Sequence, residues 1–206
     1  MPVYINSSCV IANNVATKNG VCIFENKDTT VLEFLTSLYK HSEIEYPKFY
    51  KMDMLCKLGF LASEILLRES VDLKKYNPFE KGIILSNAQS SLDTDYKYAK
   101  TMQTNASPAL FVYTLPNILI GEICIRNNIK GESAFFINEQ PDTAFMTEYV
   151  QTLFNTHKFE ACIYGWVDLF EEDYKAVLFY LEKEKSDNSI PFTVENINNI
   201  YQIKNG

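Results

Sequence analysis

The spacing of apolar residues along the chain predicts strands that alternate with helices. Across Lys51–Glu69 they recur at three- and four-residue intervals, which places them on one face of a helix. Similar spacing predicts helices at Thr30–Lys40, Thr143–Thr156 and Pro191–Tyr201, and in the second of these Phe145 and Tyr149 fall on the side expected to be buried. Short apolar runs predict strands at Met1–Ala12, Gly20–Phe24, Gly82–Ser86, Ser133–Ile137, Phe159–Val167 and Ala176–Leu181.

Proline, glycine and polar stretches mark the boundaries of these elements. Ala109–Ile129 fits one helix, in which Pro116 would cause a kink or lie near the start. Lys130 and Gly131 then form a stop signal. Polar turns or tails are predicted at Asn87–Asp93, Asn138–Asp142 and Glu182–Ser189.

Several of the predicted strands are apolar at every position, which is typical of strands buried on both faces of a sheet. Their alternation with helices predicts an α/β fold in which helices cover a mixed, mostly parallel sheet. The late pair of strands, Phe159–Val167 and Ala176–Leu181, could add an antiparallel edge. The 206 residues contain no repeat, low-complexity tract or Pro/Gly/Ser linker, so a single domain over residues 1–206 is predicted.

Composition narrows the possible partners. The net charge of -7 disfavours nucleic acid and anionic membrane surfaces, because Lys and Arg dominate binding to both. The first residues show no signal peptide, and no apolar run approaches the ~18–20 residues needed to cross a membrane. The five cysteines form no C-x-x-C pair and have apolar neighbours, which predicts reduced, mostly buried thiols in a cytoplasmic protein.

No cofactor and no metal site is predicted. No His or Cys is spaced to share a metal with the four acidic residues of this region, so they are expected to form a solvated rim: Glu122, Glu132, Glu139 and Asp142. Only two histidines exist, His41 and His157, and both are expected to be ordinary surface or boundary residues.

A distinctive order of residues lies between Asn105 and Gly131. It consists of a Ser-Pro step, a Leu-Pro-Asn turn, a glycine within a helical stretch and an Ile-Lys-Gly end: Ser107, Pro108, Leu115, Pro116, Asn117, Gly121, Ile129, Lys130 and Gly131. This order resembles the β-ketoacyl-ACP synthases of the thiolase-like superfamily. Weaker similarities extend the resemblance over Met1–Leu181, at Tyr50–Asp53, Gly82–Leu92 and Phe159–Trp166, where Trp166 replaces the second glycine of a pair.

The resemblance implies a thiolase-type fold, in which two similar α/β halves pack together in a chain about twice as long. Only the N-terminal half is represented here, and we expect the second half to be absent. The face that meets the second half would be apolar, and large exposed apolar patches are rare on monomers. It could be repacked by the tail Ser189–Gly206, buried in a dimer, or covered by another synthase subunit.

The resemblance also implies where a catalytic nucleophile would lie. Family members place a reactive cysteine after the strand that follows Lys-Gly, at the start of a helix that lowers the pKa of the thiol. Counting from Gly131 puts this position at Gln140, and no cysteine lies between residues 125 and 161. The histidines, or His and Asn, that stabilise the oxyanion come from the family's second half. His41 and His157 match neither motif.

Three interpretations of Gln140 remain open. In chain-length-factor subunits, the silent partners of polyketide synthases, Gln commonly replaces the cysteine. In loading-module ketosynthases, Gln at this site accompanies malonyl decarboxylation. The third interpretation is that Gln140 simply caps or leads into the helix that begins near Asp142.

The vacant nucleophile position favours a non-catalytic accessory subunit over an enzyme. Such a subunit would act in fatty-acid or polyketide-type synthesis, for example of aryl polyenes, as a chain-length-factor-like partner of a full-length ketosynthase. Family members pair the strand before the nucleophile across the dimer axis, so a homodimer or heterodimer is expected through Ser133, Ala134, Phe135, Phe136 and Ile137.

Two alternatives differ in class. The first is a stand-alone module that binds an acyl chain or an acyl carrier protein, with a tunnel lined by Phe111, Leu115 and Leu119. The second is a residual acyltransferase or malonyl decarboxylase activity that a partner completes.

Overall fold

A computed structural model describes residues 2–69 and 71–202. The strands are β1 (Tyr4–Ala12), β2 (Val15–Lys18), β3 (Val21–Glu25), β4 (Lys81–Asn87), β5 (Ser133–Ile137), β6 (Ala161–Phe170), β7 (Asp173–Glu182) and β8 (Ile190–Pro191). The helices are α1 (Val31–His41), α2 (Met54–Leu66), α3 (Leu92–Thr101), α4 (Pro108–Val112), α5 (Ile118–Asn127), α6 (Thr143–Asn155) and α7 (Val194–Tyr201). Short 3₁₀ turns occupy Pro47–Lys51, Leu73–Lys75 and Pro78–Glu80.

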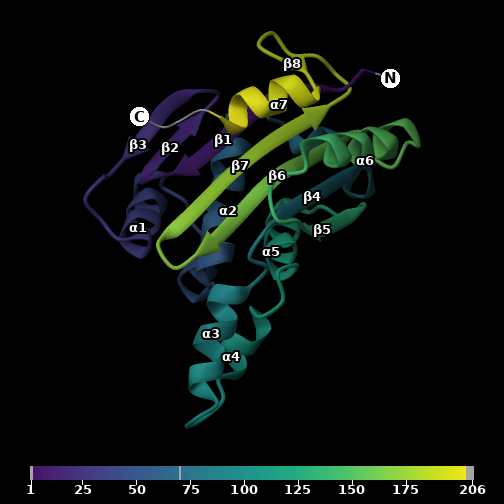
Figure 1. Ribbon diagram of the computed structural model, residues 1–206. Helices are drawn as coiled ribbons and strands as arrows, with labels where there is room; N and C mark the ends of the chain where they lie inside the picture. The colour runs from purple at the N-terminus through teal and green to yellow at the C-terminus, as the bar shows by residue number, and fades with distance from the viewer. Residues whose placement is uncertain (1, 70, 203–206) are drawn as a thin grey trace.

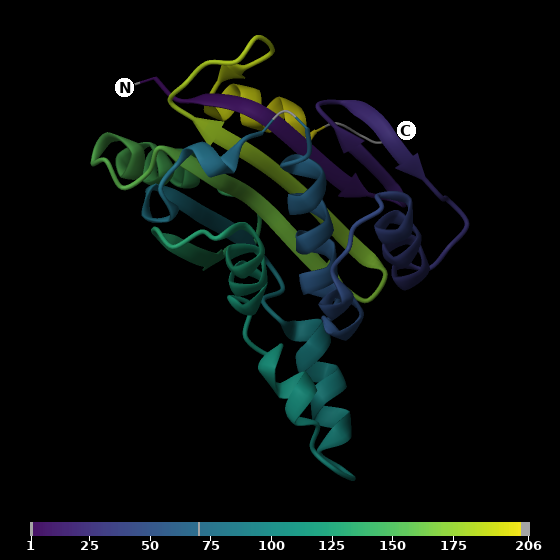
Figure 2. The same cartoon turned by 180° about the vertical axis from the view of Figure 1, so that it is seen from behind.

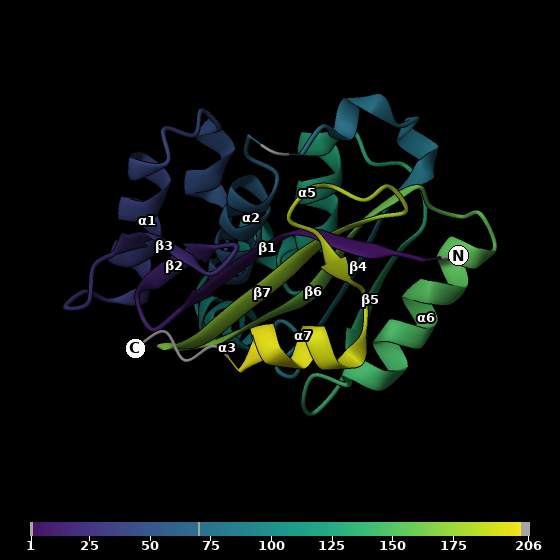
Figure 3. The ribbon, with the colours of Figure 1, turned by 90° about the horizontal axis from the view of Figure 1, so that it is seen from above.

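All the strands join one mixed sheet between two layers of helices (Figure 1), which confirms the predicted α/β class. The strand order is β3-β2-β1-β7-β6-β4-β5, and β8 also pairs with β1. Viewed from above, α1, α2 and α5 lie on one side of the sheet, and α6 and α7 on the other (Figure 3). Each layer encloses its own apolar core.

The sheet is not mostly parallel, and that part of the prediction was wrong. β4 pairs in parallel with β5 and β6, but every other pairing is antiparallel. The antiparallel pairing of β1, β2 and β3 has a local cause, because two-residue turns join β1 to β2 and β2 to β3. Asn13 and Asn14 form the first turn and Asn19 and Gly20 the second, all with positive φ, as tight hairpins require.

β6 and β7 form the centre of the sheet, which corrects the prediction that they would add an edge. They pair over their full length, from Ala161↔Glu182 to Phe170↔Asp173, and are buried on both faces. Gly165 is required for this pairing, since an added Cβ would lie 2.1 Å from the backbone oxygen of Val177. Trp166, the only tryptophan, is buried on the same strand.

The predicted helix over Ala109–Ile129 is two helices. Ser107 caps α4 by accepting a hydrogen bond from the Leu110 amide at 3.3 Å, and Pro108 begins it. Pro116 lies in the turn between α4 and α5, because proline cannot donate the backbone hydrogen bond that a continuous helix needs. α3, which is mostly polar, was not predicted, and α3 and α4 project from the body together as an arm (Figure 2).

α5 and α2 pack closely on one face of the sheet. Asp53 starts α2 by accepting from the Cys56 amide at 2.9 Å. Gly59 lets the helices approach, because a Cβ there would lie 2.5 Å from the Leu119 side chain. Within the described residues, no helix is long and apolar enough to cross a bilayer.

The described part of the tail packs on the same face of the sheet as α6. Phe192 and Ile197 are buried in the second core, and Ile200 and Tyr201 pack against it. The described part of the tail ends at residue 202, so the last four residues of Ser189–Gly206 lie outside the described residues, as does Met1 of the first predicted strand.

Replacing Ile197 should therefore destabilise the whole domain. We expect Ile197→Ala to lower the free energy of unfolding by about 2–4 kcal/mol, because it removes fully buried methyl groups and leaves a cavity. Val194 lies on the same helix but is partly exposed, so Val194→Ala is the matched control. Equal urea midpoints for the two variants would show that α7 contributes nothing to the core.

Candidate functional site

The candidate site is the loop that follows β5. The Asn138 amide donates to the Asn87 carbonyl at 2.9 Å, so the loop starts beside the end of β4. Asp142 accepts from the Phe145 amide at 3.0 Å and caps α6. Residues 138–144 line an open cavity of about 500 Å3. A strand that leads through a short loop into a helix N-terminus is the arrangement expected for the nucleophile position.

Gln140 lies in this loop with an exposed side chain. Asp142 caps the helix, so the interpretation that Gln140 is the cap was wrong. Gln140 instead lies in the loop that leads into the helix. The Nδ2 atom of Asn138 is buried without a hydrogen-bond partner among the described residues.

No thiol near this loop replaces the missing cysteine in the described structure. Cys9, Cys56 and Cys162 are buried, and burial raises the pKa of each thiol. Burial also raises the pKa of Cys124 to about 11. Cys22 is exposed on β3, at the far edge of the sheet from β5. The prediction of mostly buried thiols is confirmed.

The two histidines lie away from the loop. His41 is exposed on α1, where its ring lies 4.9 Å from the ring of Phe24. His157 is exposed beyond the C-terminus of α6, so this 13-residue helix, about 20 Å long, separates it from Gln140. Neither can act as a base on a group held at Gln140.

The predicted acidic rim is only partly correct. Glu132, Glu139 and Asp142 are exposed, but Glu122 is buried on α5 and pairs with the Lys48 ammonium at 2.7 Å. Leu119 and Ile123 neighbour Glu122 on the helix surface and are also buried, so their apolar character was the available signal in the sequence. Across the described ranges, no group of three His, Cys, Asp or Glu residues is arranged to hold a metal.

The three residues expected to line a tunnel have different environments. Phe111 on α4 is 57% exposed and Leu115 in the following turn is 54% exposed, whereas Leu119 on α5 is fully buried against Gly59. The chain therefore brings Leu119 into its own core and leaves the other two on the arm.

β5, the expected dimer strand, has the predicted bounds and forms one edge of the sheet. It pairs with β4 alone, from Ile83↔Ser133 to Asn87↔Ile137. Ala134, Phe135 and Phe136 are half-buried, while Ser133 and Ile137 are exposed.

α6 adds aromatic residues beside this edge. The Phe136 ring lies edge-on to Phe145 at 5.5 Å and to Tyr149 at 5.1 Å. Tyr149 is half-buried and packs against the second core, as expected. Phe145 is exposed, contrary to the expectation that it would face the core.

Comparison of the whole fold with solved structures gives consistent matches. The chain superposes on "The ishigamide ketosynthase/chain length factor" with a TM-score of 0.66 and 15% identity, over 93% of this chain and 64% of that one. The chain has the thiolase-like ketosynthase fold. No protein-family model and no curated protein sequence matches it.

Two further matches come from complexes. One, a type II polyketide synthase ketosynthase with its acyl-carrier protein, gives a TM-score of 0.63 at 15% identity, over 88% of this chain and 62% of that one. The other is a ketosynthase, ApeO, in complex with its chain length factor, ApeC, from Xenorhabdus doucetiae. It gives a TM-score of 0.60 at 12% identity, over 98% of this chain and 90% of that one. The chain thus spans less than two-thirds of the first two and nearly all of the third.

Thiol reactivity should reflect these environments. With iodoacetamide at pH 8, we expect Cys22 to react first. Cys124 should react far more slowly, because with a pKa near 11 only roughly one thiol in a thousand is ionised. Since that pKa is raised, its rate should increase about tenfold per pH unit up to about pH 11. Timed mass spectrometry measures both, with Cys22→Ser as control, and fast labelling of Cys124 at pH 8 would contradict the assignment.

Restoring a thiol at the vacant position should not restore condensation. Gln140→Cys supplies an exposed sulfur ahead of the Asp142 cap, but neither described histidine is near enough to assist. We expect alkylation of one additional thiol and no release of carbon dioxide from malonyl-acyl carrier protein. The alkylation is the control that reagents reach the new thiol. Decarboxylation above the wild-type background would contradict the prediction that this thiol has no assisting base.

Proposed function

We propose that this chain is a non-catalytic ketosynthase-like subunit that pairs with a full-length ketosynthase through β5. It would act in fatty-acid or polyketide-type synthesis, for example of aryl polyenes. The observation that carries the proposal is an open β5 edge beside a loop that contains Gln140, at the position where the resemblance implies a nucleophile.

The backbone of β5 is available for pairing. Ile83 donates to the Glu132 carbonyl at 3.1 Å, and Asn138 donates to the Asn87 carbonyl at 2.9 Å. Because amides alternate along a strand, those of Phe135 and Ile137 point away from β4. An edge with free amides and apolar side chains favours association with another strand.

The side chains beside the edge suit a protein partner. Ile137 and Phe145 are exposed, and the rings of Phe136 and Tyr149 lie between them and the core. Aromatic residues are enriched where protein surfaces meet. Further exposed apolar residues lie on the arm, so partner contact could extend there: Tyr96, Met102, Phe111, Val112 and Leu115.

The tunnel residues favour this proposal over a stand-alone acyl-binding module. A tunnel within this chain would need Phe111 and Leu115 to face inward, but both are exposed. We propose that a partner covers them and that they border the acyl chain only in the complex.

The comparisons support partnership. Two of the matched structures are named for a ketosynthase together with a chain length factor. One chain of the Xenorhabdus doucetiae complex aligns over 90% of its length, so a chain of about this size occurs in such an assembly. An acyl carrier protein accompanies a third ketosynthase, and it could approach this chain when the partner is bound.

The direct test is affinity purification of the tagged chain from its native host, followed by mass spectrometry. We expect a full-length ketosynthase to co-purify in equal amounts. Recovery of the chain only as a monomer or homodimer would overturn the heterodimer proposal.

A charge on the β5 edge should weaken this complex. We expect Ile137→Lys to reduce ketosynthase recovery at least about tenfold, because lysine on an edge strand opposes strand pairing. Val21→Lys is the matched control, since Val21 is 66% exposed on β3 at the other edge and Ile137 is 50% exposed. Equal recovery with both variants would exclude β5 as the contact.

A further inference from the structure

A second cleft lies away from the nucleophile loop. It has a volume of about 470 Å3 and is formed by the chain before β4 and by the end of α5. Five of its lining residues are apolar or aromatic: Leu67, Val71, Leu73, Tyr76 and Pro78. Three basic residues also line it, Lys74, Lys81 and Arg126, with one acid, Asp72.

The cleft is remote from Gln140. β4 and β5 are parallel, so their first residues lie at one end and the nucleophile loop follows the other. Lys81 is the first of the seven residues of β4, which places it about 20 Å along the strand from that loop. The cleft is therefore separate from the candidate site and from the β5 pairing on which the proposed function rests.

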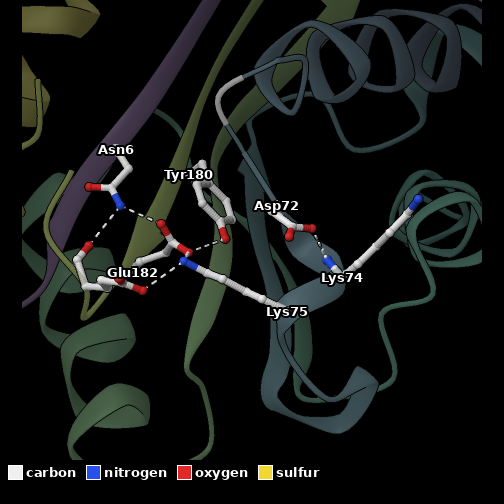
Figure 4. Close-up of polar contacts among 7 residues, drawn as sticks. Asn6, Asp72, Lys74, Lys75, Tyr180 and Glu182 are labelled. Carbon is white, nitrogen blue, oxygen red and sulfur yellow. Dashed lines mark hydrogen bonds and ion pairs between the residues drawn. The ribbon is translucent and has the colours of Figure 1, made fainter. Parts of the chain in front are cut away.

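One wall is fixed by a cluster of polar contacts (Figure 4). The buried Glu182 carboxylate accepts from Asn6 Nδ2 at 2.5 Å and from the Tyr180 hydroxyl at 2.7 Å, and it pairs with Lys75 at 2.9 Å. Lys75 also pairs with Glu184 at 3.0 Å. These contacts attach the turn Leu73–Lys75 to the end of β7.

The same turn directs its two lysines to opposite sides. Lys75 reaches Glu182, whereas Lys74 extends away from the cluster (Figure 4). Asp72 Oδ1 accepts a hydrogen bond from the Lys74 backbone amide at 2.9 Å, and this bond fixes the turn. Glu182 and Glu184 thus both pair with Lys75. Lys74 lies on the cleft wall without an ion pair among the described residues.

Lys81 is the unusual residue of the cleft. It is only 4% exposed, and its ammonium donates to the Asn127 carbonyl at 3.0 Å, at the end of α5. In the described structure no carboxylate pairs with it, and its burial lowers its pKa. An ammonium has three donors, so a buried one with a single partner is poorly compensated.

Arg126 differs from the two lysines. Its Nε and Nη2 atoms donate to Glu64 at 3.1 and 2.9 Å, so its charge is already balanced. With Arg126 balanced by Glu64, the charged residues that remain in the cleft are Lys74, Lys81 and Asp72, so the cleft keeps a net positive charge in a protein whose net charge is -7. A basic site with apolar walls selects a ligand that combines an anionic group with an apolar body.

We propose that this cleft binds a small organic anion, a carboxylate or phosphate monoester on an apolar body, whose charged group is held by Lys81 and Lys74. The apolar body would lie against the wall that contains Leu73 and Tyr76. Binding would supply the counter-charge that Lys81 lacks.

Isothermal titration calorimetry of the whole chain with octanoate and with octyl phosphate tests the proposal. We expect saturable one-to-one binding of at least one of them, which would identify the charged group, and weaker binding of neutral octanol. Absence of binding by both anions at millimolar concentration, or equal binding of octanol, would overturn it.

Two variants locate the site. Lys81→Met keeps the length of the side chain without the charge, and Lys74→Gln removes the charge from an exposed side chain whose loss should leave the fold intact. We expect each to weaken binding by about tenfold or more, since each removes a charged donor to the anionic group.

Lys100→Gln on α3 is the charge-matched control, because Lys100 is also exposed and lies outside the cleft. If Lys81→Met fails to fold, Lys74→Gln still decides the question. Unchanged affinity of Lys74→Gln relative to Lys100→Gln would overturn the assignment. The chain is tested alone, so failure here is independent of whether a ketosynthase binds β5.

Discussion

The central hairpin of β6 and β7 is apolar on both faces, so both faces must be covered. α2 and α5 cover one face, where Gly59 and Leu119 set their close packing. α6 and the tail helix α7 cover the other. Because both faces must be covered, the tail becomes part of the core. The surfaces that remain open are the edges of the sheet and the projecting arm of α3 and α4.

The loop after β5 leads to the N-terminus of α6, with Asp142 capping the helix and Gln140 exposed ahead of it. The chemistry around it is not kept in the described chain, since the nearest groups are amides and carboxylates, and the histidines lie elsewhere. The described chain thus has the strand, the loop and the capped helix, with no thiol or imidazole beside them.

Much of the fold followed from the sequence because apolar spacing reports burial directly. It located β4, β5, α2 and α6, and the Ser107–Gly131 pattern pointed to the ketosynthase fold. The errors arose where local chemistry overrides spacing. Asn13-Asn14 and Asn19-Gly20 form hairpin turns that spacing alone does not reveal, and Pro116 divides a helix that hydrophobicity joins. Lys75 and Glu182 are 107 positions apart, and no local pattern predicts that long-range contact.

The sheet has two edge strands, β5 and β3. If β5 of one molecule joins a strand of another, the combined sheet still ends in β3, a short strand with exposed Val21 and Ile23. Cys22 lies between them with an exposed sulfur. Two β3 edges that meet in an oxidising buffer can therefore become covalently linked, and the product would have the same mass as a homodimer formed through β5. Handling this protein under reducing conditions keeps the two kinds of association distinguishable.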